Sequence, residues 1–301
     1  LTNDGSPADG DSYSPAISAD GRYVAFMSYA SNLIPGEPNS YYCDIFIHDR
    51  DPDGNGVFDE GNGYTELVSA GYEGMLSDGP SWGPSISADG RLVAYVSEAS
   101  NLIGSDTNGT PDVFVTDMAS HHTRRVSVAT GGAEADGMSD YARISADGRF
   151  VVFTSDATNL VANDTNGVGD IFRHELSSGQ TIRVSLSSGG AQADSPCFSP
   201  AISAGGGWVA FSSAATTLVD GLPDCLSTQV YLRIVSAGQT VLVSQAPDGT
   251  PGNCPSAAFF APAFSGDGPY LIFDSGASNL IPSDANGVNY DIFLFILPAP
   301  F

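Results

Sequence analysis

The stretch Ser14–Ser28, with the sequence SPAISADGRYVAFMS, decides the fold because four similar stretches follow it along the chain. The later copies are GPSISADGRLVAYVS from Gly83, YARISADGRFVVFTS from Tyr141, SPAISAGGGWVAFSS from Ser199 and APAFSGDGPYLIFDS from Ala261. One apolar residue marks the same place in each copy, at intervals of 58 to 69 residues: Ile17, Ile86, Ile144, Ile202 and Phe264. Repeats of this length indicate a radial or solenoid architecture rather than one continuous sheet.

Each copy predicts four antiparallel strands. A short run ending in Ile-Ser is reversed by a turn such as Asp20-Gly21, and an alternating run such as Tyr23–Phe26 follows. A third strand then starts at an Asp before an apolar pair, and a fourth reads Thr-x-x-Val-Ser. The third strands start at Asp44, Asp112, Asp170 and Asp291, and the fourth strands include Thr123–Ser127, Thr181–Ser185 and Thr240–Ser244. Four such strands form one blade of a β-propeller.

The predicted fold is therefore an all-β, five-bladed propeller that occupies residues 1–301 as a single domain. The blades are expected at about 12–70, 80–128, 138–186, 196–245 and 257–297. The 35 glycines and 19 prolines keep the apolar runs short, which suits strands joined by tight turns. No stretch approaches the roughly 20 apolar residues that a membrane-spanning helix needs, and no signal peptide is visible, so we expect a mature or trimmed form.

With their S-A-D-G-R turn and D-I-F strand, the repeats resemble those of TolB-type β-propellers over nearly the whole chain. The resemblance implies the fold but not a function, because that family includes periplasmic envelope proteins, peptidase gating domains and exported proteins of unknown role. The fourth copy departs from the pattern, with Gly205-Gly206 in place of Asp-Gly and Gln229 in place of the third-strand Asp. The count of five also differs from the six blades typical of TolB.

The fifth repeat ends after its third strand, at 291–297, and has no Thr-x-x-Val-Ser segment of its own. Residues 1–5 align with the segment around Val126-Ser127, so we expect them to be the stub of a closing fourth strand. A third strand left at an edge has unpaired N–H and C=O groups. We expect residues upstream of Leu1 in a longer chain, a partner protein, or a strand donated by a neighbouring copy to complete this blade, and strand donation between copies would build fibres. The alternative is a tolerated short edge, blunted by the terminal prolines.

The net charge of the chain limits the classes of partner that it can bind. The chain has 35 acidic residues against 10 basic ones, all of them Arg, for a net charge of −25. Such a surface repels phosphate backbones and anionic lipid, which argues against nucleic acid and against membrane binding. An acidic, lysine-free, Gly-rich chain with four cysteines indicates a secreted, extracellular or cell-surface protein, with the periplasm as the alternative compartment.

The strongest local motif is a run of oxygen-bearing residues after the third strand of blade one. Oxygen ligands at alternate positions before a Gly match the start of an EF-hand-type calcium loop, although the twelfth position is Asn62 and no helices flank it. We therefore predict calcium here, with an acidic surface hairpin as the alternative. The predicted ligands are Asp51, Asp53, Asn55, Val57 and Asp59.

A weaker acidic motif recurs between the second and third strands of three blades. Asn-Gly supplies positive φ and Asp side chains bond nearby backbone N–H groups, so turn chemistry alone explains the pattern, with calcium as the alternative. The residues are Asp106, Asn108 and Asp112 in blade two, Asp164, Asn166 and Asp170 in blade three, and Asp284, Asn286 and Asp291 in blade five.

The four cysteines form no C-x-x-C metal or redox pair. We expect a disulfide between Cys225, in a loop of blade four, and Cys254, in the crossing that leaves the same blade. A Cys197–Cys225 pair is the second choice. Cys43 lies on blade one, away from blade four, and is the candidate for an intermolecular disulfide. The alternative is four separate thiols.

No catalytic constellation is visible in the sequence. His48 and His174 occupy one repeat position, His121 and His122 lie in a turn, and no G-x-S-x-G elbow accompanies them. A glycosidase needs two carboxylates that face each other across a cleft. The acidic residues expected at the axial mouth, Asp78, Asp136, Asp140 and Asp194, are candidates for such a pair, with ordinary turn residues as the alternative. The sequence thus predicts a non-catalytic structural or protein-interaction propeller that self-associates at blade five. The alternative is a carbohydrate-binding or glycan-active propeller with its ligand at the axial mouth.

Overall fold

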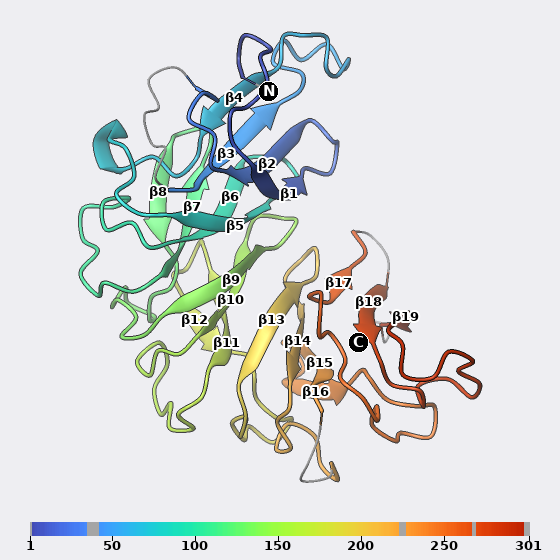
Figure 1. Ribbon diagram of the computed structural model, residues 1–301. Coiled ribbons are helices and arrows are strands. Elements are labelled where there is room, and N and C mark those ends of the chain that lie inside the picture. Colours follow the sequence, from blue (N-terminus) through green and yellow to red (C-terminus); the bar gives the residue numbers. More distant parts are fainter. Residues whose placement is uncertain (1, 35–41, 223–226, 267–268, 298–301) are drawn as a thin grey trace.

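A computed structural model describes residues 2–34, 42–222, 227–266 and 269–297. Within these ranges it confirms an all-β chain of five antiparallel sheets, one for each repeat (Figure 1). Four sheets have four strands, and the fifth has three. In the same ranges the only helical element is the short 3-10 turn η1 (Tyr72–Gly74). The predicted propeller architecture with an incomplete last blade is therefore confirmed.

Each blade takes its strands from one repeat of the sequence. Blade one contains β1 (Ser12–Ile17), β2 (Tyr23–Ser28), β3 (Asp44–Asp49) and β4 (Tyr64–Leu67). Blade two contains β5 (Ser81–Ile86), β6 (Leu92–Ser97), β7 (Asp112–Asp117) and β8 (His122–Arg125). Blade three contains β9 (Ser139–Ile144), β10 (Phe150–Ser155), β11 (Asp170–Glu175) and β12 (Thr181–Arg183). Blade four contains β13 (Cys197–Ile202), β14 (Trp208–Ser213), β15 (Gln229–Ile234) and β16 (Gln239–Leu242), and blade five contains β17 (Ala263–Phe264), β18 (Tyr270–Ser275) and β19 (Asp291–Ile296).

The glycine in the turn between the first two strands also sets the contact with the preceding blade. Gly206 in blade four has φ 71°, and a Cβ there would lie 2.2 Å from the Phe150 ring of blade three. Gly90 in blade two has φ 74° and the same relation to the Tyr23 ring of blade one, at 2.1 Å. Backbone conformation and close approach both require glycine at these positions.

A Gly206→Ala substitution should destabilise the protein, because it adds about 1–2 kcal/mol of left-handed backbone strain to the clash with Phe150. The matched control is Gly207→Ala, since Gly207 has no positive φ and a Cβ there meets no atom within 4 Å. Urea unfolding should give a lower midpoint for the first variant and a nearly unchanged midpoint for the second. Equal midpoints for the two variants would contradict this account of the turn.

Apolar clusters hold successive blades together. Each of four clusters joins one pair of neighbours, from blades one and two to blades four and five. At the inner ends of blades one to four, the amide of Ala19 donates to Ala88 O, that of Ala88 to Ala146 O, and that of Asp147 to Ala204 O, at 2.8–3.1 Å. Burial of the facing aliphatic and aromatic side chains is the main source of stability for such an arrangement.

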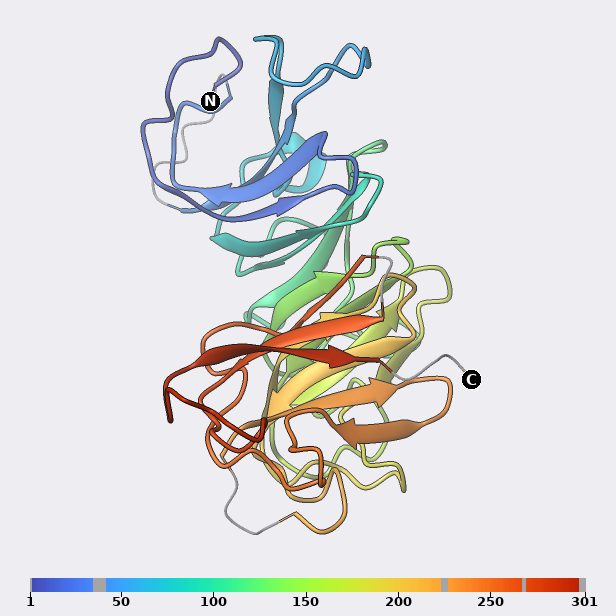
Figure 2. The same ribbon diagram turned by 90° about the vertical axis from the view of Figure 1, so that its right-hand side faces the viewer.

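The five blades form an open arc, with blades one and five at its two ends (Figures 1 and 2). In the described ranges no apolar cluster joins blade five to blade one, whereas every other neighbouring pair shares one. The innermost strand of blade one, β1, is accordingly exposed at all its residues except Ala16.

The N-terminal residues do not form the expected closing strand. Residues 2–5 form a turn in which the amide of Gly5 donates to Thr2 O, and Asn3 exchanges two hydrogen bonds with the backbone of Thr65 in β4. Thr130 makes the equivalent exchange with Thr181 between blades two and three. Residues 2–5 therefore take the place of a blade-to-blade crossing turn on blade one, because the side chain of Asn3 satisfies the backbone of an outer strand there. Leu1 lies outside the described residues.

Candidate functional site

A serine at the end of each fourth strand forms two hydrogen bonds with the start of the third strand. In blade two, Ser127 Oγ donates to Asp112 Oδ1 at 2.5 Å and accepts from the amide of Val113 at 3.1 Å. The same pair of bonds recurs in the other four-stranded blades, through Ser69 to Asp44, Ser185 to Asp170 and Ser244 to Gln229. The serine thus satisfies a buried side chain and a buried N–H at once, which buried polar groups require.

In blades two and three an arginine two residues before this serine neutralises the acidic loop motif. Arg125 Nη1 lies 3.1 Å from Asp112 Oδ2 and 3.3 Å from Asp106 Oδ1, and it also bonds Glu134. Arg183 Nη1 lies 2.8 Å from Asp170 Oδ2 and 3.0 Å from Asp164 Oδ1. Both guanidinium groups are almost completely buried, so each pair of carboxylates carries its counter-charge inside the protein.

The surroundings of Arg125 shift the pKa values of two neighbouring carboxyl groups in opposite directions. Burial, reinforced by the neighbouring Asp112, raises the pKa of Asp106 to about 6 despite Arg125. Burial opposes ionisation of Glu134 too, but hydrogen bonds from Thr107 and the charge of Arg125 lower its pKa to about 2. Asp106, Asp112 and Glu134 are the only three potential metal ligands that converge within 4.8 Å in the described part of the chain. The cation that lies among them is the Arg125 side chain.

Blade four uses a neutral version of the same junction. Gln229 replaces the aspartate, and Leu242 stands at the position of the arginine, opposite Tyr231. Gln229 Oε1 still accepts from Ser244 Oγ at 2.7 Å. In blade one Leu67 also stands at the arginine position, opposite Phe46, while the third strand still starts with Asp44. Among the complete blades, an arginine accompanies the acidic pair in blades two and three.

Blade five has the acidic half of the junction without a fourth strand. Asp284 and Asp291 correspond to Asp106 and Asp112, and with Ser283, Asn286 and Ile292 they line a hollow of about 590 Å³ at the edge of β19. Asn286 Nδ2 donates to Asp291 Oδ1 at 3.1 Å, and Asp284 Oδ1 accepts from two backbone amides of the turn. In the described residues no strand pairs with the outer edge of β19. This edge is the candidate functional site.

The predicted calcium loop of blade one closes through its own hydrogen bonds. Asp51 accepts from the amides of Asn55 and Gly56 at 3.0 and 2.9 Å, and Asn55 Oδ1 accepts from the amide of Val57. Asp59 forms an ion pair with Arg50 instead of joining Asp51. Calcium in this loop stays a prediction, which a chelator-dependent fall in the unfolding midpoint would check.

The described cysteines are all thiols. Cys43 and Cys197 are buried, Cys254 is partly exposed, and none of the three forms a disulfide in the structure. Cys225, a member of both predicted pairs, lies outside the described residues. Burial raises the pKa of Cys197 to about 12, so this thiol stays protonated and unreactive at neutral pH.

The histidines and acidic residues considered for catalysis have separate structural tasks. His174 is buried and hydrogen-bonded to the Thr181 hydroxyl, and its burial lowers its pKa to about 4. Asp78, Asp136 and Asp194 each accept from the backbone amide and the hydroxyl of one residue in the loop after their own blade's second strand. These residues are Ser100, Thr158 and Thr216. Asp140 accepts from Trp82 Nε1.

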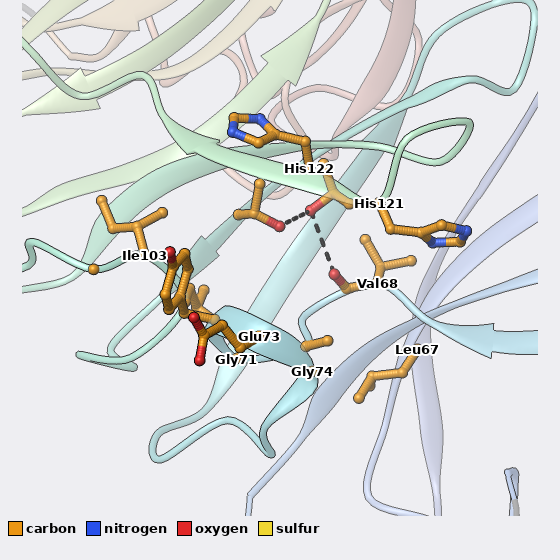
Figure 3. Close-up of a pocket in the computed structure, with 14 residues that line it drawn as sticks. Leu67, Val68, Gly71, Glu73, Gly74, Ile103, His121 and His122 are labelled. Carbon is orange, nitrogen blue, oxygen red and sulfur yellow. Dashed lines mark hydrogen bonds between the residues drawn. The ribbon is translucent and has the colours of Figure 1, made fainter.

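Two further hollows have linings unlike an acid–base centre. One lies between η1 and β8, where the rings of His121 and His122 point away from each other (Figure 3). The other lies at one axial mouth, where all five blades contribute mainly isoleucine and alanine, and Ser265 is the only polar side chain among the described residues that line it. Neither hollow brings together two carboxylates of the described chain.

Sequence reasoning placed the acidic loops correctly but missed their partners, Arg125 and Arg183. The signal was present, since both residues stand in the segment Thr-x-Arg-Val-Ser. Their role depends on the pairing of the third and fourth strands, which sets Arg125 opposite Phe114 and Arg183 opposite Phe172.

The fold is that of a β-propeller with an incomplete last blade, and it is similar to the solved structures of TolB and of peptidase propeller domains. TolB from Acinetobacter baumannii is 19% identical with a TM-score of 0.50, and the match covers 87% of this chain and 48% of that one. A putative TolB from Agrobacterium tumefaciens is 16% identical with a TM-score of 0.51, over 95% of this chain and 82% of that one. A third match is the β-propeller domain of the Trilobed protease from Pyrococcus furiosus, which is described as having an open velcro topology. It is 10% identical with a TM-score of 0.52, and the match covers 96% of this chain and 71% of that one.

At these identities the likeness concerns the fold alone, and the chain spans about half the length of the Acinetobacter protein. No protein-family model matches the chain, and no curated protein matches it in sequence. Over the described residues, no helix has the length and apolar character needed to cross a membrane.

Proposed function

We propose that this chain is a non-catalytic, extracellular protein-interaction propeller that associates with further copies of itself through the open end of blade five. The observation that carries the proposal is the outward face of this blade, where Ile272, Ile292 and Leu294 are 43%, 68% and 60% exposed. The equivalent residues of blade four, Ala210, Val230 and Leu232, are fully buried in the cluster shared with blade five. Blade five thus ends in the kind of face that another blade covers elsewhere in the chain.

Blade one offers a matching surface. Val24 and Phe26 are partly exposed, whereas their equivalents Val209 and Phe211 are fully buried against blade three. Blade one of a second copy would cover blade five of the first as blade five covers blade four. A contact between two different surfaces propagates into rows or fibres when the rotation between copies does not close a ring. The net charge of −25 would oppose this contact, and salt would therefore promote it.

Two observations support a non-catalytic role. Among the carboxylates considered for glycan chemistry, Asp78, Asp136 and Asp194 each hold a loop of their own blade, and Asp140 accepts from Trp82 of blade two. The described lining of the axial mouth is mainly isoleucine and alanine. Glycosidase chemistry needs two carboxylates flanking one bond. No specific feature of the site favours the carbohydrate alternative.

The proposal is tested by sedimentation of the chain over a range of protein and salt concentrations. The wild-type mass should rise with concentration and more steeply at higher salt, and electron microscopy should show extended rows. Ile292→Lys/Leu294→Lys should remain monomeric because lysines on this face would be buried on contact. Met138→Lys, at an exposed apolar residue beside the first strand of blade three, is the control that should behave like the wild type. A wild-type chain that stays monomeric throughout would exclude self-association.

A further inference from the structure

We propose that the edge of β19 binds an extended segment of a second polypeptide with the sequence Arg-Val-Ser, its arginine entering the hollow beside Asp284 and Asp291. The inference deepens the proposed function, since it takes blade five as the interaction surface and specifies what pairs with its edge. It rests on a comparison of the five blades within this chain.

The serine is required by the start of β19. In all four complete blades a serine of the fourth strand accepts from the amide of the second residue of the third strand and donates to the side chain of the first. In blade five these positions are the Ile292 amide and the Asp291 carboxylate, and Asp291 receives only the Asn286 side chain among the hydrogen bonds of the described residues. A strand with serine opposite Asp291 would satisfy both groups.

The arginine is required by charge. Blades with two acidic residues at the loop and the strand start, Asp106 with Asp112 and Asp164 with Asp170, both have an arginine in the fourth strand. Blade five keeps both acidic residues, Asp284 and Asp291. A guanidinium can bond several oxygens at once in a fixed geometry, so it suits this hollow better than a lysine does.

The intervening valine is required by the apolar face. Val126 and Val184 stand between the arginine and the serine and are buried in the clusters that join their blades to the next. A valine at this position of a bound segment would lie beside the exposed Ile292 and extend the apolar face of blade five. The bound strand would therefore enlarge the apolar face of blade five. Self-association through that face would not require the bound strand.

The probe is a fluorescent peptide with the sequence of residues 180–188, QTIRVSLSS, whose binding to the full chain is measured by anisotropy at low salt. Binding should weaken at least tenfold when the peptide arginine becomes glutamine or its serine becomes alanine. Asp291→Asn in the protein should cause a similar loss, and this variant should no longer discriminate between the arginine and glutamine peptides. Asp248→Asn, which removes one charge from an exposed turn, is the matched control and should bind like the wild type.

Each outcome decides the inference. A peptide that binds no better than its scrambled sequence excludes strand addition at β19, and equal binding of the arginine and glutamine peptides excludes the arginine hollow. Circular dichroism shows whether Asp291→Asn is folded, and the peptide substitutions test the same contact without altering the protein. Sedimentation without peptide tests self-association separately, so the two proposals can fail independently.

Discussion

Replacing Arg183 by leucine should lower the free energy of unfolding by about 3–5 kcal/mol, because it leaves two carboxylates buried without their counter-charge. Arg183 Nη1 lies 2.8 and 3.0 Å from Asp170 and Asp164, and all three side chains are at most 6% exposed. Urea unfolding at pH 7 measures the loss. A decrease below about 1 kcal/mol would place this cluster with ordinary surface ion pairs and contradict the prediction.

The matched variant combines Arg183→Leu with Asp170→Gln and copies the neutral junction of blade four. There Leu242 and Gln229 occupy these two positions, and Gln229 keeps the bond from Ser244. A glutamine at position 170 should keep the bond from Ser185 in the same way. The double variant should therefore recover at least half of the stability lost in the single variant. A double variant less stable than Arg183→Leu would show that charge balance is not the reason for the loss.

The loss of unfolding free energy caused by Arg183→Leu should also become smaller as the pH falls. Burial raises the pKa of Asp164, and Arg183 is the strongest opposing influence, so its removal should raise that pKa further. A carboxyl whose folded-state pKa exceeds its unfolded value binds its proton more tightly in the folded state. Its contribution to stability is fully present below the unfolded pKa and is lost as the pH rises through the folded pKa. The difference between wild type and variant should accordingly be smaller at pH 5 than at pH 7.

Local features of the fold were predictable because they depend on neighbouring residues. The Asp-Gly turn, the strand that begins at Asp170 and the three-stranded sheet of blade five in the described residues all follow from short patterns. In contrast, the junction of Arg183 with Asp164 and Asp170 joins residues 19 and 13 positions apart through the register of two strands and a loop. The sequence shows that the loops are acidic, but only the strand pairing shows which cation they hold.

The N-terminus illustrates the same limit. Alignment of residues 1–5 with the end of a fourth strand was reasonable from the repeat, yet Asn3 belongs to the turn after such a strand and bonds Thr65 in blade one. A shift of a few residues in a repeat alignment separates a strand from its following turn. The distinction matters because residues 2–5 bond blade one and do not pair with the edge of β19.

The same aromatic position in two blades should respond very differently to truncation. Phe172 stacks on Phe153 with ring centroids 5.9 Å apart, and Phe293 stacks on Phe273 at 5.7 Å. Phe172 is fully buried, so Phe172→Ala should cost about 3–5 kcal/mol in urea unfolding. Phe293 is partly exposed, and Phe293→Ala should cost about 1–2 kcal/mol, since less apolar surface is lost.

The cause of this difference connects stability with binding. Phe46 in blade one is buried although no blade of the described chain precedes it, and it packs with Leu67 of its own fourth strand. The partial exposure of Phe293 therefore reflects the missing fourth strand of blade five. A saturating concentration of the QTIRVSLSS peptide should stabilise the wild type more than it stabilises the Phe293→Ala variant. The reason is that the bound strand would cover the Phe293 ring, which the variant lacks. Equal stabilisation of the two proteins would show that the peptide does not cover this ring and that β19 is not its binding site.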